Sequence, residues 1–275
     1  MRHRSKLDEV LSNPALHPKT LTDRERSDGF KWHDHAESHR SSQIFCLSAF
    51  GTLRCLTACD RVLEKLFSHA FTGLPSRPRP RHWEIIPEFE EPTLLGETGG
   101  RQPAFCVSSR EVICVESKYI VDARDGFGGC SQFSKGACAG FYGSGSDLQS
   151  RTAAWCRLEN WEGDRAPRLY WALGKRFFNE SVFQRQHSDA ACPLRGSSYQ
   201  LMRNFLFAAT YAERHRKDFF GLLAIALDLS DRLSSELAEF ETQFFCLSIA
   251  IGSLSSNMNA TSNCWRSMVM GMART

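Results

Sequence analysis

The sequence lacks the long apolar segments that mark a membrane or exported protein. No apolar run approaches the ~18–20 residues of a membrane-spanning helix. The best candidates, Phe219–Leu227 and Phe244–Leu254, have only the length of a strand or a core helix. No apolar stretch follows Met1–Lys6, so we expect no signal peptide and no membrane partner.

A strong excess of one charge is also absent. Lys and Arg number 34 against 31 Asp and Glu, and the net charge of +3 neither indicates nor excludes a nucleic-acid partner. There is no GxxxxGK[ST] phosphate loop, and Gly126-x-Gly128-Gly129 opens no recognisable helix. The 11 Cys, an odd number, form no regular framework. Their simplest interpretation is free thiols in a reducing compartment, which predicts a cytoplasmic protein.

Composition divides the chain into four parts. Residues 1–40 contain few apolar residues, so we expect them to be disordered. Residues 41–83 begin with apolar residues at helical spacing, which predicts one or two amphipathic helices, and end in a linker rich in Pro and Arg. Residues 84–230 hold the strand and helix patterns of a compact domain. Residues 231–275 contain one more helical stretch and an irregular tail.

The linker carries Arg77, Arg79 and Arg81, interleaved with Pro78 and Pro80. We interpret it as an extended basic connection between two structured segments. A strip that contacts phosphate groups is the alternative.

The compact part begins with a hairpin pattern. Ala104–Val107 and Glu111–Glu116 are short, largely apolar runs separated by a polar turn, and the second contains an unbroken apolar stretch typical of a strand covered on both faces. A long Gly- and Ser-rich connection follows. The clearest helix is expected at Ser198–Lys217, where Ser197 or Ser198 can cap its start, and a buried strand at Phe219–Leu227 comes directly after it.

The informative point is Glu116-Ser117-Lys118 at the end of the hairpin. Glu116 and Lys118 lie two residues apart on a strand, so their side chains project from the same face. In phosphodiester hydrolysis a carboxylate helps to hold Mg²⁺, the metal lowers the pKa of a bound water, and a lysine orients that water or neutralises the phosphate. An isolated Glu-x-Lys pair is weak evidence, because simple surface ion pairs have the same spacing.

Three stretches carry a family resemblance: Glu111–Tyr119, Pro167–Gly174 and Cys192–Asn204. Together they resemble a bacterial branch of the PD-(D/E)xK, or restriction endonuclease-like, nuclease superfamily, over about residues 100–228. The resemblance implies an α/β fold with an αβββαβ core, a long insertion and irregular N- and C-terminal extensions. Residues 84–230 would then be the nuclease-like domain.

The resemblance also implies roles for individual residues. Glu116 would be a metal ligand, Lys118 the catalytic lysine, and Gln200 a catalytic residue that orients groups at the site. The backbone carbonyl of Ser117 would be a further ligand. The implied cofactor is Mg²⁺ (or Mn²⁺), and the implied partner is DNA.

One part of the family pattern is missing. The family places an Asp about ten residues before the Glu, and that position falls near Cys106, with no acidic residue between Arg101 and Arg110. A soft thiol suits Mg²⁺ poorly. We expect Glu97, or another carboxylate of residues 84–97, to approach the metal instead.

Basic residues around the site predict contact with nucleic acid, Arg101 and Arg203 above all. For Gln200 and Arg203, a buried polar network that ties the helix to its neighbours is an equal interpretation. The expected function is metal-dependent phosphodiester hydrolysis of DNA, in an active or an impaired form. The alternative is a catalytically inactive nuclease-like protein with a DNA-binding or structural role.

Overall fold

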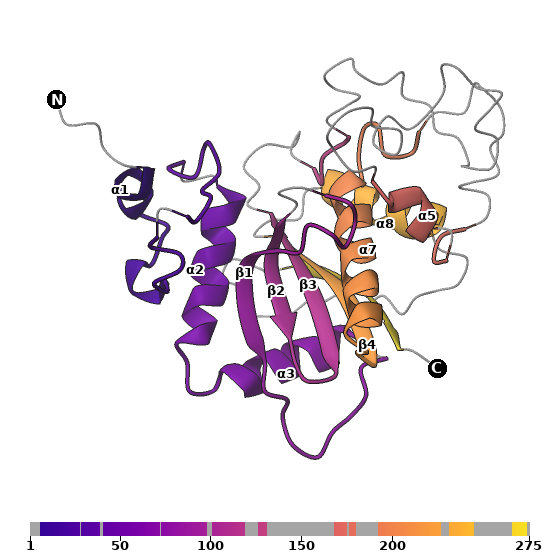
Figure 1. Cartoon of the computed structure of the whole chain (residues 1–275), viewed down its shortest axis with the longest axis horizontal. Helices are drawn as coiled ribbons and strands as arrows, with labels where there is room; N and C mark the ends of the chain where they lie inside the picture. Colours follow the sequence, from indigo (N-terminus) through magenta and orange to yellow (C-terminus); the bar gives the residue numbers. More distant parts are fainter. Residues whose placement is uncertain are drawn as a thin grey trace.

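The structure is a computed structural model, and it describes residues 6–27, 29–38, 41–71, 73–97, 101–118, 126–130, 168–174, 176–179, 192–226, 231–244 and 266–273. Figure 1 shows their arrangement. In chain order the elements are α1 (Lys6–Leu11), η1 (Pro18–Thr20), α2 (Ser42–Arg54), α3 (Cys59–Ala70), β1 (Glu84–Glu90), β2 (Arg101–Val107), β3 (Glu111–Lys118), α5 (Tyr170–Gly174), α7 (Tyr199–Arg214), β4 (Phe219–Ala226), α8 (Asp231–Phe244) and β5 (Arg266–Ala273).

A mixed five-stranded sheet, in the order β1-β2-β3-β4-β5, forms the centre of the molecule. All neighbouring strands are antiparallel except β3 and β4, which run parallel. Parallel neighbours need a crossover connection, and α7 lies within it. The predicted hairpin, the following helix and the buried strand are therefore confirmed as β2–β3, α7 and β4.

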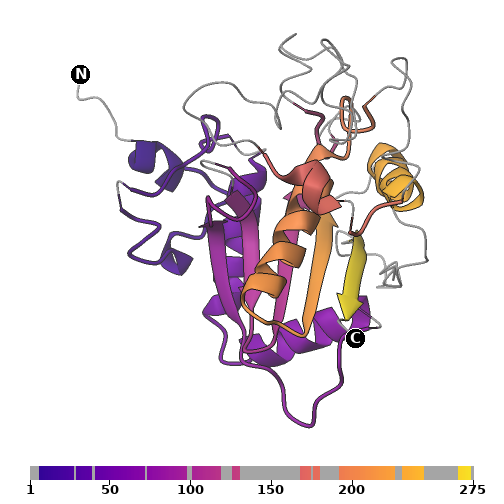
Figure 2. The ribbon, with the colours of Figure 1, turned by 45° about the vertical axis from the view of Figure 1, so that its right-hand side comes forward.

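Helices cover the two faces of the sheet. Val112 and Cys114 of β3 pack with α7 on one face, whereas Ile113 and Val115 pack with α2 and α3 on the other. Figure 2 shows α7 lying across the front of the strands. Because both faces are covered, the central strand is apolar at every position from Val112 to Val115, as the sequence predicted. The mixed α/β class is confirmed.

The two expected helices of residues 41–83 are α2 and α3. Ser41 caps α2, where its side chain accepts a hydrogen bond from the backbone N–H of Ile44. The expected capping of α7 by a serine hydroxyl is wrong, because Ser198 takes the left-handed conformation with φ 63° and its side chain makes no capping bond.

The N-terminal segment differs from the predicted disorder. Within residues 6–27 and 29–38, Asn13 donates hydrogen bonds to the carbonyls of Ala36, Glu37 and Ser38. The sparse apolar side chains gather against Ile44 and Leu47 of α2. They come from irregularly spaced positions, so no periodicity in the sequence revealed this small core. Its buried members in the segment are Val10, Leu16, Leu21, Phe30 and Ala36.

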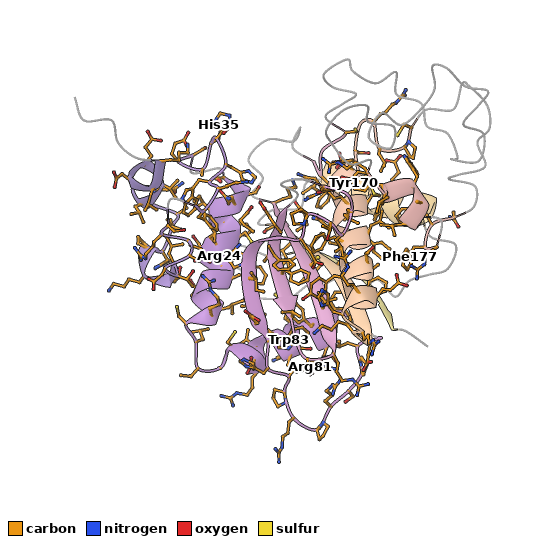
Figure 3. The ribbon with its side chains drawn as sticks, viewed as in Figure 1. Arg24, His35, Arg81, Trp83, Tyr170 and Phe177 are labelled. Carbon is orange, nitrogen blue, oxygen red and sulfur yellow. The ribbon has the colours of Figure 1, made fainter. Side chains whose placement is uncertain are left out.

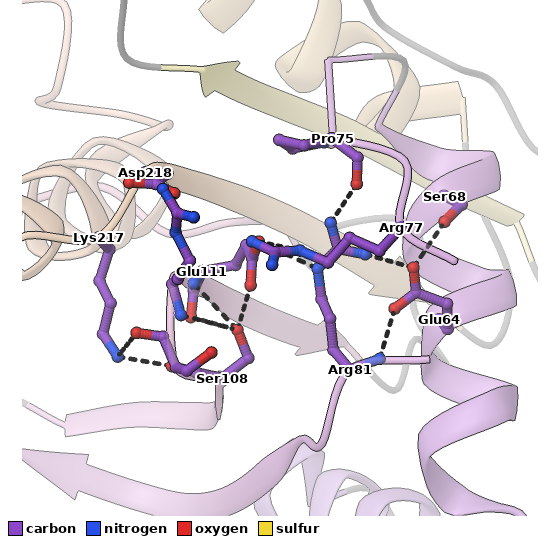
Figure 4. Close-up of polar contacts among 11 residues, drawn as sticks. Glu64, Ser68, Pro75, Arg77, Arg81, Ser108, Glu111, Lys217 and Asp218 are labelled. Atoms are coloured by element: carbon purple, nitrogen blue, oxygen red, sulfur yellow. Dashed lines mark hydrogen bonds and ion pairs between the residues drawn. The ribbon is translucent and has the colours of Figure 1, made fainter. Parts of the chain in front are cut away.

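The Arg/Pro linker is tied to the sheet. Glu111 at the start of β3 is fully buried and accepts hydrogen bonds from Arg77, while Arg81 Nε lies 3.1 Å away (Figure 4). Arg81 also pairs with Glu64 of α3. Burial acts against ionisation of Glu111, but the bonds from Ser108 and the two arginines outweigh it, so its pKa is lowered. These contacts support a structural role for Arg77 and Arg81 over contact with phosphate groups.

The C-terminal part also extends the expected structure. The predicted helix is α8, and β5 adds a strand beside β4 in a stretch that the sequence suggested was irregular. Its sequence, with four polar or small residues among three Met and one Val, has little β propensity, so pairing with β4 decides its conformation. Across the residues described, no helix has both the length and the apolarity needed to cross a membrane.

Candidate active site

Glu116 and Lys118 lie together at the carboxyl end of β3, on the face covered by α7. Glu116 is buried, with 3% of its surface exposed. Lys118 Nζ lies 3.3 Å from Glu116 Oε1. The prediction that the two side chains share one face is confirmed.

Helix α7 holds both of these side chains. Lys118 Nζ donates to Gln200 Oε1 at 2.5 Å, and Asn204 Nδ2 donates to Glu116 Oε2 at 2.6 Å. Gln200 and Asn204 are four residues apart, so they lie on the same face of the helix. The sequence places Gln200, Arg203 and Asn204 about one turn apart on one helix face, but only Gln200 and Arg203 were predicted as site residues.

Glu97 lies in a second, connected group. Both of its carboxylate oxygens accept hydrogen bonds from Arg203 Nε, at 2.9 and 2.8 Å, and Tyr170 donates its hydroxyl to the same carboxylate. Tyr170 lies 3.0 Å from the hydroxyl of Tyr199, and burial is the main cause that raises the pKa of both tyrosines, Tyr199 to about 12. Both hydroxyls therefore stay protonated, and the one on Tyr170 can donate to Glu97.

The two groups form one network along α7. Arg203 Nη1 lies 3.4 Å from Asn204 Oδ1, which links the Glu97–Arg203 pair to Glu116. Burial works against the charge on Arg203, but Glu97 outweighs it and raises the arginine pKa. Figure 3 shows Tyr170, the first residue of α5, and Arg81, which contacts Glu111, toward opposite ends of the sheet. The Glu111 cluster is therefore separate from the site.

Cys106 does not occupy the position of the missing acid. It is fully buried and pairs in register with Ile113, three positions before Glu116. Its side chain packs with the α2 and α3 cluster, on the opposite face from Glu116. Burial raises its pKa well above the ordinary value for a thiol. The expectation that Cys106 stands near the metal-binding position is therefore wrong, because the register of the hairpin turns it the other way.

The remaining predicted site residues are placed less directly. Ser117 faces away from the site, and its strand position pairs with Ile225 of β4. Its backbone carbonyl is the predicted ligand atom. Arg101 begins β2, but its side chain lies outside the described residues.

The charges of this site are already balanced. Two glutamates, Glu97 and Glu116, face two cations, Lys118 and Arg203. Within the ranges that the structure describes, no group of three His, Cys, Asp or Glu side chains could hold a metal ion. The donor chemistry still fits Mg²⁺, because the candidate ligands are carboxylate and carbonyl oxygens. Each oxygen of Glu116 has a nitrogen neighbour, so a bound cation would displace Lys118 or Asn204 from it.

A mixed sheet covered by helices, with a buried Glu-x-Lys pair on its central strand, is consistent with a restriction endonuclease-like protein. The profile of a family described as "Restriction Endonuclease associating with ARP" matches residues 2–230. The chain therefore belongs to that family, and the resemblance found in the sequence is confirmed. No curated protein and no solved structure matches the chain. Nucleases of the restriction endonuclease-like class usually use divalent metals.

Proposed function

We propose that this chain is a metal-dependent nuclease that hydrolyses phosphodiester bonds of DNA at Glu116 and Lys118. One observation carries the proposal: a carboxylate and an ammonium are held 3.3 Å apart in a largely buried position at the end of the central strand. The amide side chains of Gln200 and Asn204 hold both partners in place, as supporting residues do at a functional site. The corresponding αβββαβ core would consist of α3, β1, β2, β3, α7 and β4.

The proposed roles follow from the contacts. Glu116 and the carbonyl of Ser117 would hold Mg²⁺ (or Mn²⁺), with Glu97 as the nearest further carboxylate along the network. When bound, the metal would supply an acidified water and polarise the phosphate. Lys118, the proposed catalytic lysine, would orient that water or neutralise charge on the phosphate. Gln200 fixes the lysine ammonium, and this is the orienting role proposed for it.

Arg203 supports a refinement of its proposed role. Its Nε binds both oxygens of Glu97, and only 13% of its side chain is exposed. We propose that it holds Glu97, as the interpretation of a buried polar network anticipates, and that any contact with the DNA backbone is secondary. Arg101 remains a proposed phosphate contact.

The test is cleavage of plasmid and single-stranded DNA with Mg²⁺, with Mn²⁺ and with EDTA. We expect metal-dependent cleavage by the native chain and a rate about 10²–10⁴-fold lower for Lys118→Ala, the usual cost of losing a positioned proton-transfer or charge-stabilising group. Lys65→Ala is the matched control, since Lys65 is exposed on α3. Equal cleavage by native chain and Lys118→Ala would place the chemistry elsewhere.

The alternative is a catalytically inactive nuclease-like protein with a DNA-binding or structural role. It would bind DNA with a strong salt dependence and cleave with neither metal. The same experiment separates the two, because only the active nuclease predicts cleavage products.

Further proposals concern context. The family description names an association with ARP, and we propose the same association for this chain on that basis. Six of the cysteines that the structure describes are free thiols, which supports a reducing, cytoplasmic location; they are Cys46, Cys55, Cys59, Cys106, Cys114 and Cys130. Residues 84–230 stay the proposed nuclease-like domain.

A further inference from the structure

Helix α8 lies beyond the region that matches the family, yet it reaches the surroundings of the site. Its residue Glu236 is buried, with 6% exposed. Glu236 Oε2 accepts a hydrogen bond of 2.8 Å from the backbone N–H of Phe127. A buried carboxylate is costly unless it is bonded, so its presence on the inner face of α8 calls for a role.

Phe127 stands between this carboxylate and the catalytic lysine. Its ring is 1% exposed and belongs to the same core cluster as Leu233 and Leu237 of α8. Lys118 Nζ lies 5.9 Å from the centre of the ring, at the outer limit of a cation–π contact. The ammonium is therefore bounded by Glu116, by Gln200 and by the face of Phe127.

The segment 126–130 is fixed on its other side by α7 and the chain before it. Tyr199 N–H donates to the carbonyl of Gly128 at 3.1 Å, and Cys130 N–H donates to the carbonyl of Leu194 at 2.8 Å. Gly128 takes φ 70°, a left-handed conformation that favours glycine. The bond from Phe127 N–H to Glu236 is therefore a third attachment of this segment, made by the residue whose ring faces Lys118.

Gly126 shows how closely α8 approaches. A Cβ atom added to Gly126 would collide with the carboxylate of Glu236. Gly126 therefore allows this close approach, and a larger residue there would push the flexible end of the Glu236 side chain aside. Either residue can be changed independently to disturb the same link.

We infer that Glu236 is a positioning residue for Lys118, acting through the backbone and ring of Phe127. The inference rests on the proposed function, since it assigns Lys118 the catalytic part. A lysine side chain has four flexible carbons, so a fixed wall is needed to hold its ammonium in one place. Misplacement of a catalytic group by about 1 Å can cost about 10²-fold in rate.

The experiment compares Glu236→Ala, Glu236→Gln and Glu239→Gln in the full chain. Gln at 236 keeps an acceptor for Phe127 N–H, whereas Ala removes it. Glu239 is exposed on the same helix, so its substitution changes the charge equally without touching Phe127. Two quantities are measured: kcat and KM for Mn²⁺-dependent plasmid cleavage, and the rate at which an N-hydroxysuccinimide ester acylates Lys118, mapped by mass spectrometry.

We expect Glu236→Ala to lower kcat at least about tenfold and to leave KM within about twofold of the native value, because a catalytic group is misplaced. We also expect the ester to acylate Lys118 faster in this variant than in the native chain. Glu236→Gln should recover most of the rate, and Glu239→Gln should match the native chain. Gly126→Ala should reproduce the effect of Glu236→Ala. Thermal unfolding of each variant identifies any that fail to fold, and if Glu236→Ala is one of them, Gly126→Ala carries the comparison with Glu239→Gln.

Equal kcat and equal acylation in Glu236→Ala and Glu239→Gln would overturn the inference. Failure of the proposed function looks different. If the native chain cleaves no DNA, the acylation rates still decide: faster modification of Lys118 in Glu236→Ala supports the positioning link, and an unchanged rate refutes it.

Discussion

Replacing Cys106 with Asp tests the orientation of the hairpin directly. By sequence spacing alone, this change restores the acid that the nuclease pattern lacks. In the structure, position 106 is fully buried among apolar side chains of the α2 and α3 face, away from Glu116. We therefore expect Cys106→Asp to destabilise the protein and to leave metal-dependent cleavage no higher than in the native chain.

The magnitude follows from the burial. Keeping an Asp neutral at about pH 7 costs about 4 kcal/mol, because its ordinary pKa is about 3.9 and each unit is worth about 1.4 kcal/mol. Burying the neutral carboxyl without a partner adds about 1–3 kcal/mol. The sum of about 5–7 kcal/mol rivals the whole stability of a typical domain, about 5–15 kcal/mol.

The direction in which the stability of Cys106→Asp changes with pH also follows from burial. Burial raises the folded pKa of Asp above its unfolded value, so the folded state binds the extra proton and the penalty shrinks as the pH falls. Between about pH 7 and pH 5 the variant should recover about 3 kcal/mol relative to the native chain. Urea unfolding followed by tryptophan fluorescence at both values measures this, and Cys106→Ala, with no ionisable group, is the control. A Cys106→Asp variant as stable as Cys106→Ala, or one that gains Mg²⁺-dependent cleavage, would refute the assigned face.

Three further predictions concern the polar groups. Asn204→Leu leaves one oxygen of Glu116 without its donor. We expect the cleavage rate to fall about tenfold or more, since a hydrogen bond to a charged group is worth about 1.5–3 kcal/mol. An unchanged rate would show that Asn204 does not support the site. Arg203→Met leaves the buried Glu97 without its cation and should lower the free energy of unfolding, measured with urea, by about 3–5 kcal/mol. Adding Glu97→Gln should restore much of that loss, and additive losses would contradict the ion pair. The lowered pKa of Glu111 stabilises the folded state above the ordinary glutamate pKa of about 4.5, and this stability is lost as the pH falls through the folded pKa. Arg77→Met should therefore flatten the acid limb of thermal stability, and parallel acid limbs would rule this out.

Local patterns predicted the elements that position the site. The apolar run of β3, the hairpin turn and the periodicity of α7 are contained in short stretches of sequence, and they brought Glu116, Lys118 and Gln200 to the correct faces. The face of Cys106 was not accessible in the same way, because it depends on how β2 registers against β3. Strand register is set by which residues pair across the sheet, and the local pattern of a single sequence does not show this pairing.

Contacts between residues far apart in the chain could not be predicted from the sequence for a related reason. Glu97 and Tyr170 meet although they are 73 positions apart, and neither residue carries a local signal of the other. The small N-terminal core formed from irregularly spaced side chains that only the surface of α2 brings together. Nothing in local propensity anticipates such contacts, because their free energy comes from tertiary packing.

The two buried glutamates of β3 have a consequence for folding. Val112 to Val115 is equally apolar toward both faces, so hydrophobic burial alone would tolerate a shift of the strand by one residue. Glu111 and Glu116 stand at opposite ends of the strand and turn to opposite faces, each toward its own set of donors. A slip by one residue would swing both carboxylates away from their partners into apolar layers at once. The two charged residues therefore fix the register of the central strand, because its apolar middle alone would accept more than one register.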